Sequence, residues 1–104
     1  CNPYLATTVL LAAGLDGIEK KLDPGVPNER NMYEVSEETL HREGIGVLPS
    51  TLKDAIDALE QDAVIQAALG DEYAKTYIAA KRAEWEEYHN FVSQWEIDHY
   101  VDIY

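Results

Sequence analysis

Residues 3–22 read PYLATTVLLAAGLDGIEKKL, and this stretch decides which kind of fold the chain can adopt. Pro3 suits the first turn of a helix, where a missing N–H has no partner to lose, and Asn2 before it is a good N-cap. Apolar residues occur around most of the helix circumference, so we expect burial on more than one side. Gly14 and Gly17 each lower helix propensity by about 1 kcal/mol, which close contact with another backbone would offset.

Helical spacing and capping residues continue along the chain, and no run of residues is typical of a strand. Ser36 precedes two glutamates, which is typical of a helix start. Thr51 and Asp54 have the spacing of a capping box, which indicates a second helix start. We therefore predict one all-α domain with about five helices. The expected elements are a first helix over 3–22, a loop over 23–35, helices over 36–43, 51–61, 63–69 and 72–93, and an apolar tail over 95–104.

Charge and composition limit the classes of partner. The 104 residues contain 8 Lys and Arg against 20 Asp and Glu, which gives a net charge of −12. Such a chain is repelled by phosphate backbones and anionic lipids, so we expect neither nucleic acid nor membrane as a partner. A solvated acidic surface and adaptation to high salt both fit this charge. The single cysteine forms no internal disulfide, which favours a cytoplasmic location.

The apolar stretch 5–15 is too short to span a membrane and is expected to be a buried helix. Because the chain starts at Cys1, directly before this apolar helix, we interpret it as a piece cut from a longer protein. The other end is also apolar, whereas chain ends are usually polar. The tail shows helical spacing and, over residues 95–98, strand-like alternation. It either folds back on its own helices or inserts into another subunit.

Residues for chemistry are sparse. No glycine-rich phosphate-binding motif is present, and His41, His89 and His99 are scattered along the chain. Arg82 and Glu86 have the spacing of a weak i,i+4 ion pair. We expect no catalytic, cofactor-binding or metal-ligating residue in this chain, which by its own residues is a helical packing module.

Several blocks of sequence resemble, in the right order, the C-terminal helical region of bacterial-type glutamine synthetases. The blocks are NPYLA at 2–6, AAGLDGIEKKLDPG at 12–25, NMYEVSEE at 31–38, LPSTLKDAIDALEQD at 48–62, EWEEY at 84–88 and WEIDHY at 95–100. The ending, over 84–90 and 93–97, is more similar to the type III or γ-glutamylmethylamide synthetase branch. That branch uses an alkylamine where the main enzyme uses ammonia.

The resemblance implies that this chain is the C-terminal helical portion of a catalytic domain, with the sheet of the parent domain absent. The parent would be an ATP-dependent ligase that joins glutamate and ammonia to form glutamine, assisted by Mg or Mn. Glutamate, ATP and the amine would bind the missing part, so this segment would be structural, oligomer-forming and inactive alone. The alternatives are a γ-glutamyl-alkylamide synthetase fragment and a free-standing acidic helical interaction domain.

The resemblance also points to two features of these residues. In regulated members of the family a tyrosine in the NMYEVSEE-like loop receives an AMP group, which corresponds to Tyr33; the alternative is an ordinary loop tyrosine. Members form a dodecamer of two stacked hexamers, in which the C-terminal segment reaches into the opposite ring. The expected inter-ring contacts are Trp95, Ile97, Tyr100, Val101, Ile103 and Tyr104.

Overall fold

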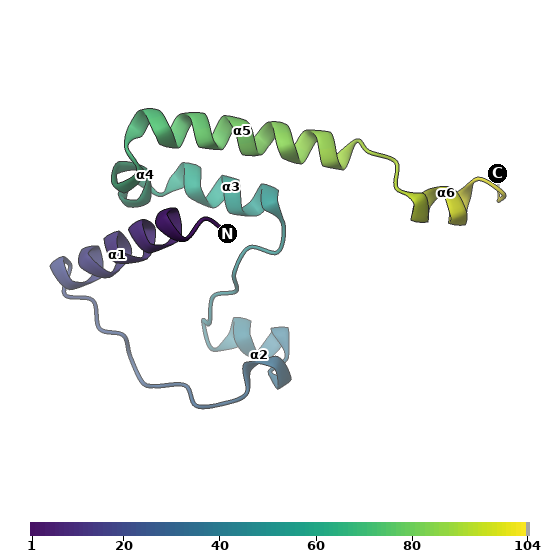
Figure 1. The fold of residues 1–104 in the computed structure, drawn as a ribbon. Coiled ribbons are helices and arrows are strands. Elements are labelled where there is room, and N and C mark those ends of the chain that lie inside the picture. The colour runs from purple at the N-terminus through teal and green to yellow at the C-terminus, as the bar shows by residue number, and fades with distance from the viewer. Residues whose placement is uncertain (104) are drawn as a thin grey trace.

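A computed structural model describes residues 1–103, and every regular element in that range is helical. The elements are α1 (Pro3–Glu19), the 3₁₀ helix η1 (Met32–Glu34), α2 (Glu37–Arg42), α3 (Leu52–Gln61), α4 (Ala63–Leu69), α5 (Asp71–His89) and α6 (Gln94–Tyr100) (Figure 1). The predicted all-α fold is confirmed. The apolar tail supplies α6 in addition to the five helices expected, so its helical spacing and not its strand-like alternation describes its structure.

Most helices begin at the capping residues that the sequence suggested. The Asn2 side chain accepts hydrogen bonds from the backbone N–H groups of Tyr4 and Leu5, at 3.0 and 3.3 Å. The Thr51 hydroxyl accepts one from the N–H of Asp54 at 3.1 Å. Each of these bonds satisfies a donor that the first helical turn leaves without a partner. Local sequence therefore fixes where these helices start.

The end of α1 differs from the prediction, because the helix stops at Glu19 and does not reach Leu22. Lys21 adopts a left-handed backbone conformation with φ of 52°. The N–H of Leu22 donates to the carbonyl of Gly17 and the N–H of Lys21 to that of Ile18, both at 3.0 Å. This is the bonding pattern of a Schellman motif, in which glycine usually occupies the left-handed position.

The longest helix also ends early, at His89 and not at Ser93. The side chain of Asn90 donates to the carbonyl of Glu86 at 2.8 Å, which satisfies one acceptor of the last turn. Ser93 is instead the N-cap of α6. The predicted single stretch over 72–93 therefore divides into α5 and a short connection to the next helix.

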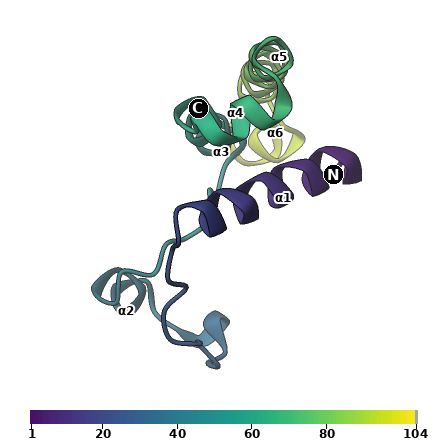
Figure 2. The same cartoon turned by 90° about the vertical axis from the view of Figure 1, so that its left-hand side faces the viewer.

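Helices α3, α4 and α5 pack on one another, and α1 packs on α4 (Figure 1). The view in Figure 2 shows α1 crossing below this group. The buried apolar residues among those described are Ile56 on α3 with Ala74 and Ile78 on α5. The core is small, and it lies between α3 and α5.

The expectation that α1 is buried on more than one side is wrong for this chain. No residue of α1 is buried, and α4 is the one described element that it contacts. Leu10 and Ile18 are 73% and 75% exposed. No backbone approaches the two glycines either, because a Cβ added at Gly14 or Gly17 would meet nothing within 4 Å.

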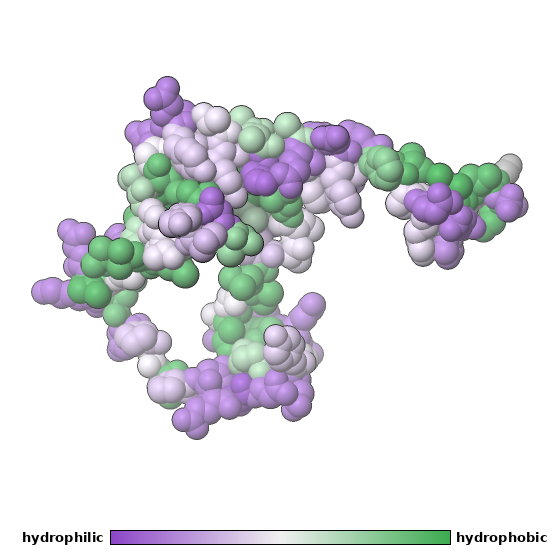
Figure 3. Space-filling view, viewed as in Figure 1, coloured by the Kyte–Doolittle hydropathy of each residue, from purple (hydrophilic) through white to green (hydrophobic). Residues whose placement is uncertain are grey.

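Two parts of the chain project from the packed helices, namely α2 with its flanking loops, and α6 (Figure 1). The radius of gyration is 18.6 Å, whereas a compact chain of 100 residues has about 13 Å. Figure 3 shows apolar surface on α1, between α2 and α3, and on α6. In the described range, no helix has the length and apolar character that crossing a membrane requires.

Replacing Lys21 by glycine is expected to stabilise the 104-residue chain by about 1 kcal/mol, since an L-residue in the left-handed region is strained and glycine is not. Urea unfolding followed by circular dichroism measures this difference. Lys21→Ala is the control, because it removes the same charge and retains a Cβ. Equal stability gains in both variants would show that charge, and not backbone strain, limits the end of α1.

Candidate functional site

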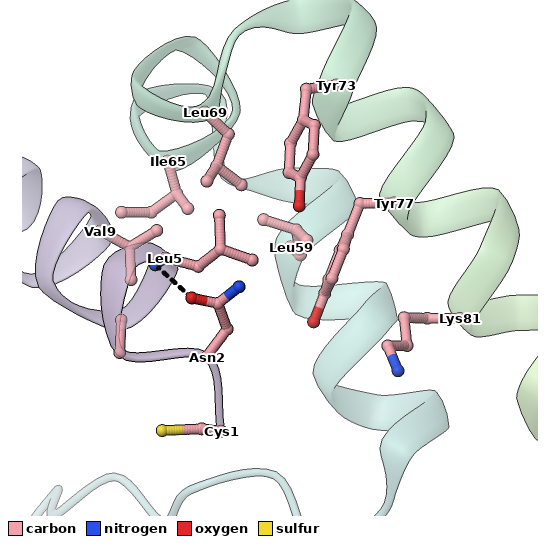
Figure 4. A pocket seen from close by; sticks show the side chains of 11 residues that line it. Cys1, Asn2, Leu5, Val9, Leu59, Ile65, Leu69, Tyr73, Tyr77 and Lys81 are labelled. Carbon is pink, nitrogen blue, oxygen red and sulfur yellow. Dashed lines mark hydrogen bonds between the residues drawn. The ribbon is translucent and has the colours of Figure 1, made fainter.

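An open cleft of about 570 Å³ lies between the start of α1 and helices α3, α4 and α5 (Figure 4). Its floor is made of aliphatic side chains from α1, α3 and α4. Its rim carries polar groups from Asn2, Tyr73, Tyr77 and Lys81. The cleft is the best-formed hollow among the described residues, and it is therefore the first candidate for a binding or catalytic site.

The groups around this cleft do not form a catalytic arrangement. The rings of Tyr73 and Tyr77 stack with their centroids 6.1 Å apart. The Lys81 ammonium lies 5.9 Å from the centroid of the Tyr77 ring and also pairs with the Glu84 carboxylate at 2.5 Å. The hydrogen bond from Lys81 to Glu84 raises the pKa of this lysine. Among the described residues, no carboxylate or imidazole lines the cleft; its ionisable side chains are those of Cys1, Tyr73, Tyr77 and Lys81.

Two of the three histidines, His89 and His99, pack against aromatic rings of their own helices. His89 stacks on Trp85 with ring centroids 5.4 Å apart, and His99 stacks on Trp95 with centroids 4.1 Å apart. Over residues 1–103, no group of three or more His, Cys, Asp or Glu side chains lies together in a way that could hold a metal ion. The described residues therefore offer no cluster of ligands for a divalent metal.

Arg82 is the principal charged contact between α3 and α5. It pairs with Asp57 at 2.8 Å and with Glu60, both on α3. The predicted pair of Arg82 with Glu86 on its own helix is not formed. The pKa of Asp57 is lowered, first by its hydrogen bond to Lys53 and then by the one to Arg82. Sequence reasoning missed this pairing, because spacing along one helix does not show which neighbouring helix offers a better carboxylate.

The predicted inter-ring residues lie on or just after α6, which is well defined by its own cap. The Ser93 hydroxyl accepts from the Glu96 N–H at 3.2 Å, and the Glu96 carboxylate accepts from the Ser93 N–H at 2.8 Å. These two bonds form a capping box. Hydrogen bonds from the backbone and hydroxyl of Ser93 lower the pKa of Glu96. The cap satisfies donors at the start of α6 through local contacts.

Helix α6 contacts no other helix of the described range. Its apolar side chains are exposed; the exposed members of the predicted set are Trp95, Ile97, Tyr100, Val101 and Ile103. Tyr104, which completes that set, lies outside the described residues. Of the two alternatives for the tail, folding back on the preceding helices is not what the structure shows for residues 94–103.

Tyr33 lies in η1, on the projecting loop between α1 and α2, and its side chain is fully exposed at 101%. Asn31 caps this turn by accepting a hydrogen bond from the Tyr33 N–H at 3.2 Å. Arg30 pairs with Glu43 at 2.6 Å across the loop and, mainly through that hydrogen bond, lowers the pKa of the Glu43 carboxyl. Tyr33 is therefore exposed to solvent on a turn that is stabilised by the Asn31 cap and by the Arg30–Glu43 ion pair.

This chain is similar to known ligases. Residues 1–100 match the family model described as "Glutamine synthetase, catalytic domain". A glutamine synthetase from Thermus thermophilus is 45% identical over 104 residues, which are 100% of this chain and 23% of the relative. A glutamate–methylamine ligase from Methyloversatilis universalis is also 45% identical, again over 100% of this chain and 23% of the relative.

The three-dimensional likeness agrees with the sequence. A solved structure described as "Apo GmaS without ligand" superposes with a TM-score of 0.73 and is 38% identical. The superposition covers 98% of this chain and 23% of that one. The chain thus spans about a quarter of the length of the curated relatives that it matches.

Proposed function

Because the chain belongs to the glutamine synthetase catalytic-domain family, we propose that it is the C-terminal helical segment of an ATP-dependent ligase that joins glutamate to an amine. The observation that carries the proposal is the family match over residues 1–100, together with 45% identity to two such ligases. A free-standing acidic interaction domain has less support, since that alternative does not account for a match over almost the whole chain.

In the proposed reaction, the side-chain carboxylate of glutamate attacks the γ-phosphorus of ATP and ADP leaves. The amine nitrogen then attacks the acyl carbon and displaces phosphate, which leaves an amide after loss of a proton. Residues 1–103 contain no group that fits ATP or a metal ion, so no step of this reaction is assigned to them. Their proposed role is structural, and the segment is inactive alone.

Two candidate amines remain, ammonia and an alkylamine such as methylamine. Each is favoured by a relative at the same 45% identity, one described as a glutamine synthetase and the other as a glutamate–methylamine ligase. The solved structure described as GmaS is 38% identical and does not separate the two. We place the residues that select the amine in another part of the parent protein.

A coupled phosphate-release assay on the full-length protein with glutamate, ATP and Mg²⁺ tests this function. We expect turnover that depends on an added amine, and the ratio of kcat/KM for ammonia and methylamine assigns the branch. The isolated 104-residue chain is the control and is expected to release no phosphate. Absence of amine-dependent turnover in the full-length protein would refute the proposed activity.

We further propose that α6 and the residues after it make the contact between two stacked hexameric rings. The support is a helix that is capped by Ser93 and Glu96, is free of the other described helices, and exposes aromatic and aliphatic side chains. Burial of such side chains in an interface is a strong driving force for association. A second subunit would supply the covering surface that this chain lacks.

Deletion of residues 97–104 from the full-length protein is expected to convert dodecamers into single hexamers, because the exposed apolar groups would no longer be buried across the rings. Sedimentation velocity measures the change. Asp98→Ala is the matched control, since it alters the same helix without removing an apolar group. Dodecamers that persist after the deletion would contradict this role of the tail.

Tyr33 is the proposed acceptor if the ligase is regulated by AMP transfer, and its full exposure makes its hydroxyl accessible to a modifying enzyme. Incubating the full-length protein with ATP and an adenylyltransferase is expected to add the mass of one AMP group. Tyr33→Phe is expected to remain unmodified. An unchanged mass of the unsubstituted protein would support the other interpretation, that Tyr33 is an ordinary loop tyrosine.

A further inference from the structure

We propose that the ion pair between Arg30 and Glu43 closes the projecting loop of this chain and thereby positions Tyr33 on it. We call residues 28–45 the Tyr33 loop; it comprises η1, α2 and the residues that flank them. The inference rests on the proposed function, because it gives Arg30 and Glu43 a part in the transfer of AMP to Tyr33. Both residues act through the loop and are positioning residues.

The Tyr33 loop is held by contacts of its own. No helix of the described range packs on α2, and the loop projects from the packed helices (Figure 1). Among the described side-chain hydrogen bonds, those that span more than seven residues of chain are made by two arginines. Arg82 joins α3 to α5, whereas Arg30 joins the two ends of the Tyr33 loop. Arg30 is therefore the side chain that closes this loop.

The geometry of the pair fixes the direction of the Arg30 side chain. Its two terminal nitrogens donate to the two carboxylate oxygens of Glu43, at 3.3 and 2.6 Å. The Asn28 side-chain oxygen accepts from the backbone N–H and the Nε of Arg30, at 3.2 and 3.1 Å. All three guanidinium nitrogens thus have an acceptor within the loop. A bidentate pair of this kind specifies orientation as well as distance.

Glu43 occupies a position that needs a cation. It is the C-cap of α2, where the helix dipole is negative and a carboxylate is unfavourable. The backbone just after it is fixed by a Schellman motif, with Gly44 at φ of 67° and the Ile45 N–H donating to the Leu40 carbonyl at 2.9 Å. The end of α2 therefore holds an acidic group in place, and Arg30 supplies the compensating charge.

Tyr33 is connected to Arg30 through very little chain. Asn31 alone separates Arg30 from η1, and it is the N-cap of that turn. The Asn31 amide also donates to the Glu34 carboxylate at 2.8 Å, and its carbonyl accepts from the Glu34 N–H at 3.1 Å. The turn that carries Tyr33 is thus ordered internally. Where Arg30 is fixed against Glu43, the backbone of Tyr33 is fixed with it.

Hydrogen exchange in the full-length protein tests whether the ion pair closes the loop. Arg30→Gln and Glu43→Gln are compared with the unsubstituted protein in peptides within residues 32–42, which exclude both substituted positions. Exchange of these amides requires the loop to open. The two side chains are 48% and 36% exposed, so the pair is of the solvent-screened kind. We expect exchange to become roughly two- to five-fold faster in each variant.

Two further variants separate the ion pair from a general effect of charge. Glu29→Gln is the matched control, because it removes the same charge from the same loop and leaves the pair intact; its exchange is expected to be unchanged. Arg30→Glu combined with Glu43→Arg restores the pair in reverse, and most of the lost protection is expected to return. Equal exchange in Glu43→Gln and Glu29→Gln, or no return in the reversed pair, would overturn the proposal.

The kinetics of AMP transfer test the positioning of Tyr33. With the full-length protein as the substrate of an adenylyltransferase, opening of the loop reduces the population that the enzyme can bind. We therefore expect Glu43→Gln to raise KM roughly two- to five-fold and to leave kcat unchanged. Glu29→Gln is expected to keep the original KM, and the reversed pair to recover it. Equal KM values in all variants would overturn the positioning role.

The two measurements separate this inference from the function on which it rests. An unsubstituted protein that accepts no AMP would refute Tyr33 as the acceptor, and the exchange rates alone would then decide whether the ion pair closes the loop. A protein that accepts AMP but shows equal exchange and equal KM in every variant would refute the ion pair alone. Modification of Tyr33 that weakens with the loss of the pair is the expected result.

Discussion

The contact between α3 and α5 is the constraint on which the rest of the structure depends. Ile56 on α3 and Ala74 and Ile78 on α5 are the buried apolar residues of the described range, and the two helices pack on each other. Ala74 is 0% exposed and carries only a methyl group, so neighbouring helices can approach it closely. Arg82 then binds Asp57 and Glu60 farther along the same interface. Apolar burial holds the two helices together, and this charged group fixes how they align.

The other helices relate to this pair in different ways. Helix α4 follows α3 directly, with Asp62 serving both as the end of one helix and as the N-cap of the next, and it offers the surface on which α1 packs. Helices α2 and α6 have no helix partner in the described range. They are stabilised by caps and local hydrogen bonds; the apolar side chains of α6 are exposed, whereas Leu40 of α2 is half-buried. The described segment thus has a small packed centre from which α2 and α6 project.

The chain belongs to a family of ligases, yet its described residues gather no cluster of metal ligands. A ligase must hold a nucleotide, a metal and two further substrates in one place, and the described residues bring together no set of groups of that kind. What they offer is apolar surface on α1 and α6 and an exposed tyrosine on a fixed turn.

The sequence by itself determined the helical class, the starts of most helices and the family resemblance. These follow from local interactions. The side chains of Asn2, Thr51 and Ser36 accept hydrogen bonds from backbone groups three or fewer residues away, so capping residues and helical periodicity can be recognised in the sequence itself. Membership of the family could also be read, because the blocks of similar residues occur in order. Tyr33 and the tail were found in the same way.

Only the tertiary structure decided which surfaces are covered. Arg82 pairs with carboxylates on another helix and not with Glu86 on its own. Helix α1 contacts one neighbouring helix where its sequence suggested several, and α6 does not fold back on the preceding helices. The physical reason is that burial depends on which other elements are present and how they approach. The apolar pattern of a helix shows that a face needs a partner, and it does not show whether that partner lies within the same 104 residues.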